Sequence, residues 1–266
     1  MLVSMRILFS VLVFSVFVLP AFVSAFALDE GRVRAVIDGD TIVVDGHSVR
    51  LLAINTPEKA RDDRPAEPGA GLATRTLKSL ISGSGTSSPK VTLVYDGNKT
   101  DRYDRLLAHV YLPDGTWLNK ALLDAGVAQV YSFPDNRRHL RELLKAEAEA
   151  RKAQKGTWGH ETWQVLEAET LTPDTRIGQF RLVEGTPLKA ARVNDRVYLN
   201  YGADWRTDFT VEIPEKFLGL FEEEGIDPLT DYPNKKLRVR GRLKPVNGVL
   251  ITVTHPEQIR ILTDSN

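Results

Sequence analysis

The chain has 266 residues, of which 42% are hydrophobic and 26% charged, and its formal net charge at pH 7 is zero. These values are ordinary for a globular protein of one large or two small domains, and they exclude a protein that coats nucleic acid through an overall positive charge. The chain has no cysteine, which excludes disulfide frameworks and thiolate metal sites.

Residues 1–27 have the pattern of a signal peptide. They begin with one positive charge, continue as an apolar run and end in small residues. We expect cleavage after Ala25 or Ala27 and export, to the periplasm or as a secreted protein. A membrane anchor through residues 7–26 is the alternative, because the apolar run is close to the length that spans a bilayer.

The elements predicted after this leader are strands followed by helices. Two β-rich segments, residues 32–44 and 47–54, are joined by Asp45-Gly46, a dipeptide that supplies the positive φ angles of a tight hairpin. A polar, proline-bearing loop occupies residues 59–68. Further strands and helices are predicted from periodicity and turn residues: a helix over 71–81, strands over 91–95 and 106–112, a short helix over 118–125 and a long helix over 137–154.

The second half is mostly strand. Residues 161–175 lack a clear period, so we predict a linker there. Beyond it lie strand signals and one helix signal: strands at 178–184, 188–193, 196–201, 209–213, 237–243, 249–254 and 259–262, and the helix at 214–224. This order is that of a small OB-type β-barrel over residues 176–263, with a generic sandwich as the alternative.

Three short stretches carry the candidate chemistry, at residues 37–41 (Ile-Asp-Gly-Asp-Thr), 50–58 (Arg-Leu-Leu-Ala-Ile-Asn-Thr-Pro-Glu) and 101–105 (Asp-Arg-Tyr-Asp-Arg). Taken singly, each has a structural explanation as a turn, an edge-strand charge or a helix start. Taken together, they place oxygen donors suited to a hard cation among two arginines and a glutamate. Such a set indicates phosphodiester hydrolysis.

In order and spacing, these motifs resemble those of the staphylococcal-nuclease (thermonuclease) family over residues 31–160. The resemblance implies a mainly β protein with helices (α+β), in which an OB-fold-type five-stranded barrel with three helices carries a calcium-dependent site. It also implies that nucleic acid, DNA and also RNA, is the substrate.

The resemblance further implies roles for eight residues. The calcium ligands would be Asp40, Asn55 and the backbone carbonyl of Thr56. The catalytic residues would be Arg50 and Arg105 on phosphate and Glu58 at the attacking water. The substrate-binding residues would be Arg102 and Tyr103. Asp38 is expected to be structural, because its side chain can close the turn that positions Asp40.

The sequence departs from the family pattern at two positions. Asn55 stands where the family usually has an aspartate, so we expect weaker calcium binding. Asp104 stands where glycine is common. Aspartate tolerates left-handed backbone angles, and its charge is expected to pair with Arg105.

The second half resembles OB-like domains appended to exported nuclease-family proteins. Single-strand binding by stacking on a basic groove has six candidate residues: Tyr198, Tyr201, Trp205, Arg206, Arg238 and Arg240. Because the segment is net acidic, a structural or protein-contact role is favoured. For the whole chain we expect an exported calcium-dependent nuclease of low sequence specificity. The alternative is a non-catalytic nucleic-acid- or protein-binding module that retains the fold.

Overall fold

A computed structural model of the protein describes residues 28–62, 64–173 and 177–263. The segment predicted as a signal peptide or membrane anchor lies outside the described residues. Within the part of the chain that is described, no helix is long and apolar enough to cross a membrane.

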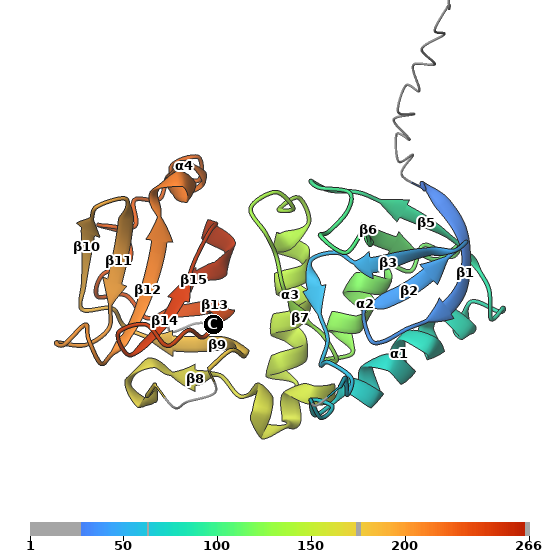
Figure 1. Ribbon diagram of the computed structural model, residues 1–266, viewed down its shortest axis with the longest axis horizontal. Coiled ribbons are helices and arrows are strands. Elements are labelled where there is room, and N and C mark those ends of the chain that lie inside the picture. Colours follow the sequence, from blue (N-terminus) through green and yellow to red (C-terminus); the bar gives the residue numbers. More distant parts are fainter. Residues whose placement is uncertain (1–27, 63, 174–176, 264–266) are drawn as a thin grey trace, which may run out of the picture.

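The N-terminal half is built on a closed five-stranded barrel with the strand order β1-β2-β3-β6-β5, which confirms the predicted architecture (Figure 1). Its strands are β1 (Glu30–Val36), β2 (Thr41–Val44), β3 (His47–Leu51), β5 (Lys90–Val94) and β6 (Leu106–Tyr111). The β2–β3 hairpin turns at Asp45 and Gly46, which have φ angles of 42° and 88° as predicted. The run predicted over residues 32–44 is divided into two strands by a turn at residues 38–40.

Three helices and a small two-stranded sheet complete this half. They are α1 (Ala70–Gly83), α2 (Leu118–Asp124), α3 (Leu140–Lys152), β4 (Ile54–Asn55) and β7 (Gln129–Val130). The helices bury Leu77, Leu122 and Leu143 completely in the same core as the barrel strands. Each such leucine contributes about 1.5 to 3 kcal/mol to stability through burial. This core holds the strand ends that carry the candidate site.

The C-terminal half contains two four-stranded sheets, in the orders β10-β11-β12-β14 and β15-β13-β9-β8. Its elements are β8 (Leu166–Glu167), β9 (Phe180–Gly185), β10 (Lys189–Val193), β11 (Arg196–Asn200), β12 (Phe209–Pro214), α4 (Leu218–Glu222), β13 (Leu237–Arg242), β14 (Val249–Thr252) and β15 (Ile259–Ile261). Short 3-10 turns also occur at η1 (Gly156–Gly159), η2 (Glu161–Trp163), η3 (Ala168–Thr170), η4 (Glu215–Phe217) and η5 (Pro256–Gln258).

The second barrel predicted for this half is therefore not closed, and two sheets with one short helix take its place. Asn247 and Gly248 do form a turn, with φ angles of 47° and 85°. The dipeptide is a hairpin signal, and next to the turn Lys244 and Leu250 form one antiparallel bridge. The pairing does not extend along the strands, because β13 pairs with β9 and β15 while β14 pairs in parallel with β12. Turn residues specify the local reversal of the chain, but not which neighbour each strand joins.

The segment predicted as a linker is structured over residues 161–173. β8 adds to the second sheet by pairing in parallel with β9. Ala168 and Leu171 are buried in the core of the C-terminal half. The two halves are thus joined by a segment that belongs to the second sheet.

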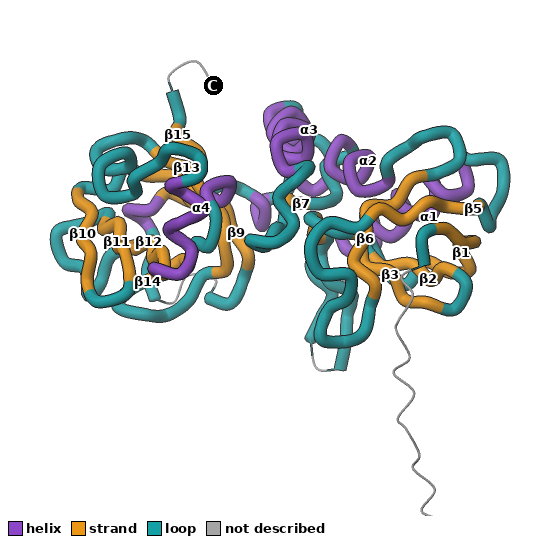
Figure 2. Tube along the Cα trace, turned by 90° about the horizontal axis from the view of Figure 1, so that it is seen from above, coloured by secondary structure: helices purple, strands orange, loops and turns teal. Residues whose placement is uncertain are grey.

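The two halves also contact each other directly through α3, which lies between the barrel and the C-terminal sheets in both views (Figures 1 and 2). Ala150 and Trp158 from the first half form a small buried cluster with Leu182 of β9. The rings of Tyr131 and Phe180 meet edge to face, 5.1 Å apart. Apolar contacts therefore span the boundary.

The six candidate residues for single-strand binding do not form one groove. Tyr201 is buried, and Arg240 is buried against the first half of the chain. Arg238 is paired with Glu184 within its own sheet. Trp205 and Arg206 are exposed and stack on each other, with the guanidinium carbon 4.5 Å from the ring centroid. Tyr198, on β11, is half-buried. The six residues therefore do not make one aromatic and basic groove, and the favoured structural or contact role stays a prediction.

Candidate functional site

The candidate site begins at the turn between β1 and β2. Asp38 Oδ1 accepts a hydrogen bond from the Asp40 backbone N–H at 3.1 Å, so Asp38 closes the turn as predicted. Gly39 packs so closely against Thr56 and Ala73 that an added Cβ would lie 2.5 Å from Thr56 Oγ1. The turn is therefore pressed onto the chain that follows β4, which brings two of the three motifs together.

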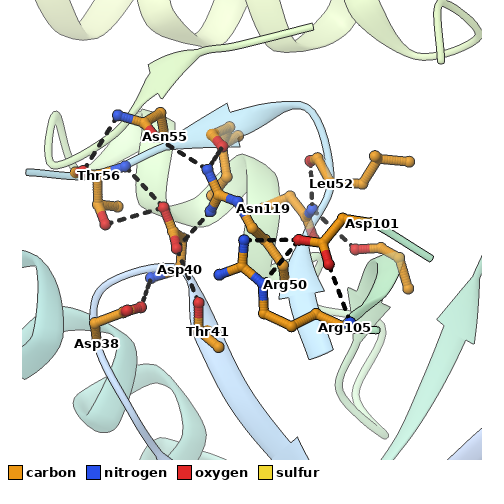
Figure 3. Close-up of polar contacts among 12 residues, drawn as sticks. Asp38, Asp40, Thr41, Arg50, Leu52, Asn55, Thr56, Asp101, Arg105 and Asn119 are labelled. Carbon is orange, nitrogen blue, oxygen red and sulfur yellow. Dashed lines mark hydrogen bonds and ion pairs between the residues drawn. The ribbon is translucent and has the colours of Figure 1, made fainter. Parts of the chain in front are cut away.

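Asp40 is almost completely buried and uses both of its carboxylate oxygens. Oδ2 accepts hydrogen bonds from the Thr56 backbone N–H at 3.0 Å and from its hydroxyl at 3.2 Å. Oδ1 accepts the Thr41 hydroxyl at 3.1 Å and lies 2.5 Å from Arg50 Nη1. Asp40 thereby connects the turn to the predicted metal and phosphate residues (Figure 3).

Arg50 projects from β3 and connects Asp40 to Asn55. Its Nη2 donates to the Ile54 carbonyl at 3.2 Å and to Asn55 Oδ1 at 3.0 Å, while Asn55 Nδ2 donates to the Thr56 carbonyl at 3.3 Å. Burial of the guanidinium acts to lower the pKa of Arg50, but the carboxylates of Asp40, Asp38 and Glu58 outweigh it and raise the pKa. Arg50 is a fixed cation among these acids.

Glu58 lies at the start of the loop that follows β4. Its backbone N–H donates to Glu67 Oε2 at 3.0 Å, and the Glu67 N–H donates back to the Glu58 carbonyl at 2.8 Å. The residue is exposed, yet partial burial of its carboxyl and the nearby Asp40 raise the pKa of Glu58, with Arg50 opposing. A carboxylate with a raised pKa accepts a proton more readily, as a group that activates water must.

Arg105 precedes β6 and is held by Asp101. Asp101 Oδ2 accepts Arg105 Nε at 2.8 Å and lies 2.7 Å from Nη2, and its Oδ1 accepts the backbone N–H groups of Tyr103 and Arg105. These hydrogen bonds outweigh partial burial and lower the pKa of Asp101. β3 and β6 are parallel neighbours, with Val49 opposite Leu106. Arg105, which immediately precedes β6, therefore lies next to the strand that carries Arg50.

The predicted ion pair between Asp104 and Arg105 is wrong. Asp104 is exposed and has a φ of 59°, which confirms the predicted left-handed turn. The partner of Arg105 is Asp101, at the start of that turn. An aspartate that accepts the N–H two residues on is a common turn signal, and this signal could have identified Asp101 from the sequence.

The two predicted substrate residues lie on the same turn and are exposed. Arg102 Nη2 donates to the Tyr103 hydroxyl at 2.7 Å, and the Tyr103 ring lies 4.8 Å from the Arg102 guanidinium carbon and 5.6 Å from that of Arg105. The structure therefore brings both of them beside Arg105. Their position leaves an aromatic face and a cation available to a substrate.

Asn119 on α2 supports the site and was not predicted. It is completely buried; its Nδ2 donates to the Leu52 carbonyl at 2.8 Å, and its Oδ1 accepts the Val110 N–H at 2.9 Å. These bonds fix the chain between Arg50 and Asn55 against β6. The only signal in the sequence is a polar residue among the apolar positions of a short helix.

The predicted calcium ligands fit a hard cation in their chemistry, since they are a carboxylate, an amide oxygen and a carbonyl within one connected set of contacts. The described residues contain no group of three histidine, cysteine, aspartate or glutamate side chains that could hold a metal. Asp40 Oδ1 and Asn55 Oδ1 both contact the Arg50 guanidinium. One carboxylate and neutral oxygens could therefore hold the cation, close to an arginine.

Taken together, a closed barrel and the small sheet next to it carry a buried carboxylate, an amide oxygen, two arginines and a glutamate of raised pKa, a set of groups chemically suited to phosphate. Comparison with known proteins agrees. Residues 48–160 match the family described as staphylococcal nuclease homologue. The chain is 33% identical over 130 residues to a thermonuclease of Staphylococcus intermedius, covering 47% of this chain and 74% of that protein.

Two further relatives are described as endonucleases. One, from Escherichia coli O157:H7, is 37% identical over 132 residues, covering 48% of this chain and 76% of the relative. The other, derived from a Bacillus subtilis prophage, is 35% identical over 128 residues, covering 46% of this chain and 41% of the relative. The chain belongs to the staphylococcal nuclease family, and the segment that matches the family model, residues 48–160, lies in the half that carries the barrel.

Proposed function

We propose that the protein is an exported, calcium-dependent nuclease that hydrolyses phosphodiester bonds of DNA and also RNA with low sequence specificity. The observation that carries this proposal is the network in which Arg50 joins Asp40 to Asn55, with Glu58 and Arg105 beside it. The names of the relatives support a nuclease. The calcium dependence, the export and the low sequence specificity are our own inferences.

The reaction follows from the charges of the site. Glu58 takes a proton from a water molecule, whose oxygen forms a bond to phosphorus while a phosphorus–oxygen ester bond breaks. The leaving oxygen keeps the bonding electrons and takes up a proton from solvent. Arg50 and Arg105 neutralise the negative charge that grows on the phosphate oxygens, and each guanidinium has five N–H donors, more than its contacts with Asp40, Asn55 or Asp101 use. Asp101 holds Arg105 in place through its side chain and backbone.

Calcium would be held by Asp40, Asn55 and the Thr56 carbonyl. When bound, it would supply positive charge to polarise a phosphate oxygen. Asp40 is already fixed by Thr56 and Thr41, so the protein itself determines where its carboxylate lies.

Low specificity follows from the chemistry of the contacts. The arginines and carboxylates address phosphate groups, which are the same in every nucleotide. Tyr103 offers a ring face, and stacking on such a face tolerates any base.

Export rests on the apolar leader. Mass spectrometry of the purified protein tests it: a mature N-terminus after Ala25 or Ala27 supports export with cleavage. An intact N-terminus in the membrane fraction would support the anchored alternative.

The activity is tested on the purified protein with denatured DNA and with RNA, in calcium or in chelator. We expect degradation only with calcium and a loss of about 10²-fold or more in Glu58→Gln, because that variant cannot accept the proton. The matched control is Glu30→Gln, a surface glutamate paired with Lys90 on the barrel. Equal rates in Glu58→Gln and wild type would refute the catalytic role of Glu58, and no degradation by the wild type would instead support the non-catalytic binding module.

A further inference from the structure

The strand β7 lies between the candidate site and the C-terminal half of the chain. One edge of β7 pairs with β4, with Ile54 opposite Val130 and Asn55 opposite Gln129. The Tyr131 N–H donates to the Ala53 carbonyl at 3.0 Å along the same edge. β7 is therefore the immediate support of the strand that carries Asn55.

The other edge of β7 is completed by one residue from each half of the protein. Glu147 Oε1 on α3 accepts the Val130 N–H at 2.8 Å. Arg240 Nη1 on β13 donates to the Val130 carbonyl at 3.2 Å. Both backbone groups of Val130 are thus satisfied by side chains, and one of these side chains comes from the C-terminal half.

Arg240 and Glu147 also hold each other. Nη1 and Nη2 of Arg240 donate to Oε1 and Oε2 of Glu147 at 3.1 Å and 2.7 Å, the two-pronged geometry that suits arginine and carboxylate. Glu147 is completely buried and Arg240 is 7% exposed. A buried charge that loses its partner is strongly destabilised, so neither residue can be removed alone without affecting the other.

The connection continues to the catalytic candidates. The Ile54 carbonyl and Asn55 Oδ1, both on β4, accept hydrogen bonds from Arg50 Nη2. Arg240 is therefore linked to Arg50 through Val130, one strand pairing and the Ile54 carbonyl. Adjacent strands lie about 4.8 Å apart, so a displacement of β7 would be transmitted to β4 over a short distance.

We propose that Arg240 is a positioning residue for the nuclease site, and that the C-terminal half serves to hold β7 and, through it, Asn55 and Arg50. The effect on β7 stands independently of the reaction, whereas the effect on turnover rests on the proposed function. Arg240 does not touch the reacting groups, so its role is to keep β4 in register behind them.

The test uses the full chain with the double substitution Arg240→Met and Glu147→Gln. It removes both charges of the Arg240–Glu147 pair together, and it removes the donor to the Val130 carbonyl. Arg151, whose Nη1 lies 4.0 Å from Glu147 Oε2, also loses a carboxylate neighbour. Hydrogen exchange of individual amides is the first readout. Those of Tyr131, bonded to Ala53, and Thr56, bonded to Asp40, report on β7 and the site, and that of Leu93 in β5 is the reference.

Two controls separate this role from general loosening of the interface. Arg238→Met changes the same strand, but Arg238 pairs with Glu184 inside its own sheet. Arg137→Met removes a different contact between the halves, the ion pair with Glu257. Arg240→Lys with Glu147 intact keeps the charge and is expected to restore part of the protection.

In the double variant we expect exchange at Tyr131 and Thr56 to accelerate by about tenfold or more, with Leu93 unchanged and both controls like wild type. We also expect kcat to fall by about fivefold or more with little change in KM, because substrate contacts on the 101–105 turn are untouched. Faster exchange in a protein without nuclease activity would support the positioning of β7 while refuting the proposed function. Unchanged exchange at both amides, or equal acceleration in Arg137→Met, would overturn the inference.

Discussion

Asp40 and Arg50 form an ion pair, with Oδ1 and Nη1 2.5 Å apart, in which the aspartate is buried and the arginine also reaches the oxygens of Ile54 and Asn55. One guanidinium therefore organises the turn before β2 and the end of β4. Four predictions follow from this arrangement and from the surrounding residues.

Arg50→Lys is expected to lower the nuclease rate by about 10² to 10³-fold, because lysine keeps the charge but cannot contact Asp40 and Asn55 as a planar fork. The measurement is kcat with calcium on denatured DNA, together with the thermal midpoint to confirm folding. Arg34→Lys is the control, since Arg34 is an exposed arginine of the same barrel paired with Asp45. A rate within a few-fold of wild type would contradict the role of the fork.

Asn55→Asp is expected to tighten calcium binding by about tenfold or more, since a second carboxylate adds charge to an oxygen set that has only Asp40. Titration calorimetry with calcium alone measures this effect. The variant loses the hydrogen bond from Asn55 Nδ2 to the Thr56 carbonyl, so the gain is less than that from charge alone. Unchanged affinity would mean that residue 55 does not contact the cation.

Asp101→Asn is expected to lower kcat by about tenfold, because the neutral amide holds the Arg105 guanidinium less firmly. Asp104→Gly is the matched change on the same turn, and we expect it to leave kcat near wild type because Asp104 is not the partner of Arg105. An ion pair between Asp104 and Arg105 would make Asp104→Gly faster than wild type. Because Arg105 pairs with Asp101, we expect no such increase. Rates that respond to Asp104→Gly and not to Asp101→Asn would reverse this assignment.

Stability is expected to fall in acid because of two buried histidines. Burial lowers the pKa of His109 to about 3, and it does the same for His255, with neighbouring cations adding to the effect. The unfolded chain protonates both near pH 6.5, so it binds more protons than the folded chain between pH 6.5 and 3. Stability is therefore complete above pH 6.5 and is lost as pH falls through this window.

Each histidine would account for up to about 2 to 3 kcal/mol of this loss by pH 4.5. Urea unfolding at pH 7 and pH 4.5 measures it. His109→Phe should flatten the dependence, because the ring packs between Trp117 and His139 and its nitrogens have no hydrogen-bond partner among the described residues. His47→Phe, at an exposed position, should leave the slope as in wild type.

The barrel half was predictable because its signals are local. The turn at Asp45 and Gly46, the helix periods and the motif spacing each specify structure within a few residues, and all appear as expected. The predicted site residues also come together, since the motifs lie at the β1–β2 turn, on β3 and before β6 of one closed barrel, and on β4 of the separate two-stranded sheet.

The parts that could not be predicted depend on partners far away in the sequence. The pairing of β14 with β12, in place of β13, is decided by how two sheets pack and not by the turn that joins the strands. Arg240 was predicted to contact nucleic acid because the sequence does not show which residue a basic side chain on a strand pairs with. Its partner, Glu147, lies 93 residues earlier in the chain. Asn119 was missed for the same reason.

The hydrogen bond between Arg240 and the Val130 carbonyl joins parts of the chain that are synthesised at different times. The donor to the Val130 carbonyl lies 110 residues later in the chain, on a strand near the C-terminus. The barrel and all three of its helices leave the ribosome before Arg240 does. A chain truncated between residues 160 and 239 would contain every catalytic candidate but would lack the hydrogen bond from Arg240 to the strand behind them. Completion of the site is in this way tied to synthesis of the C-terminal half.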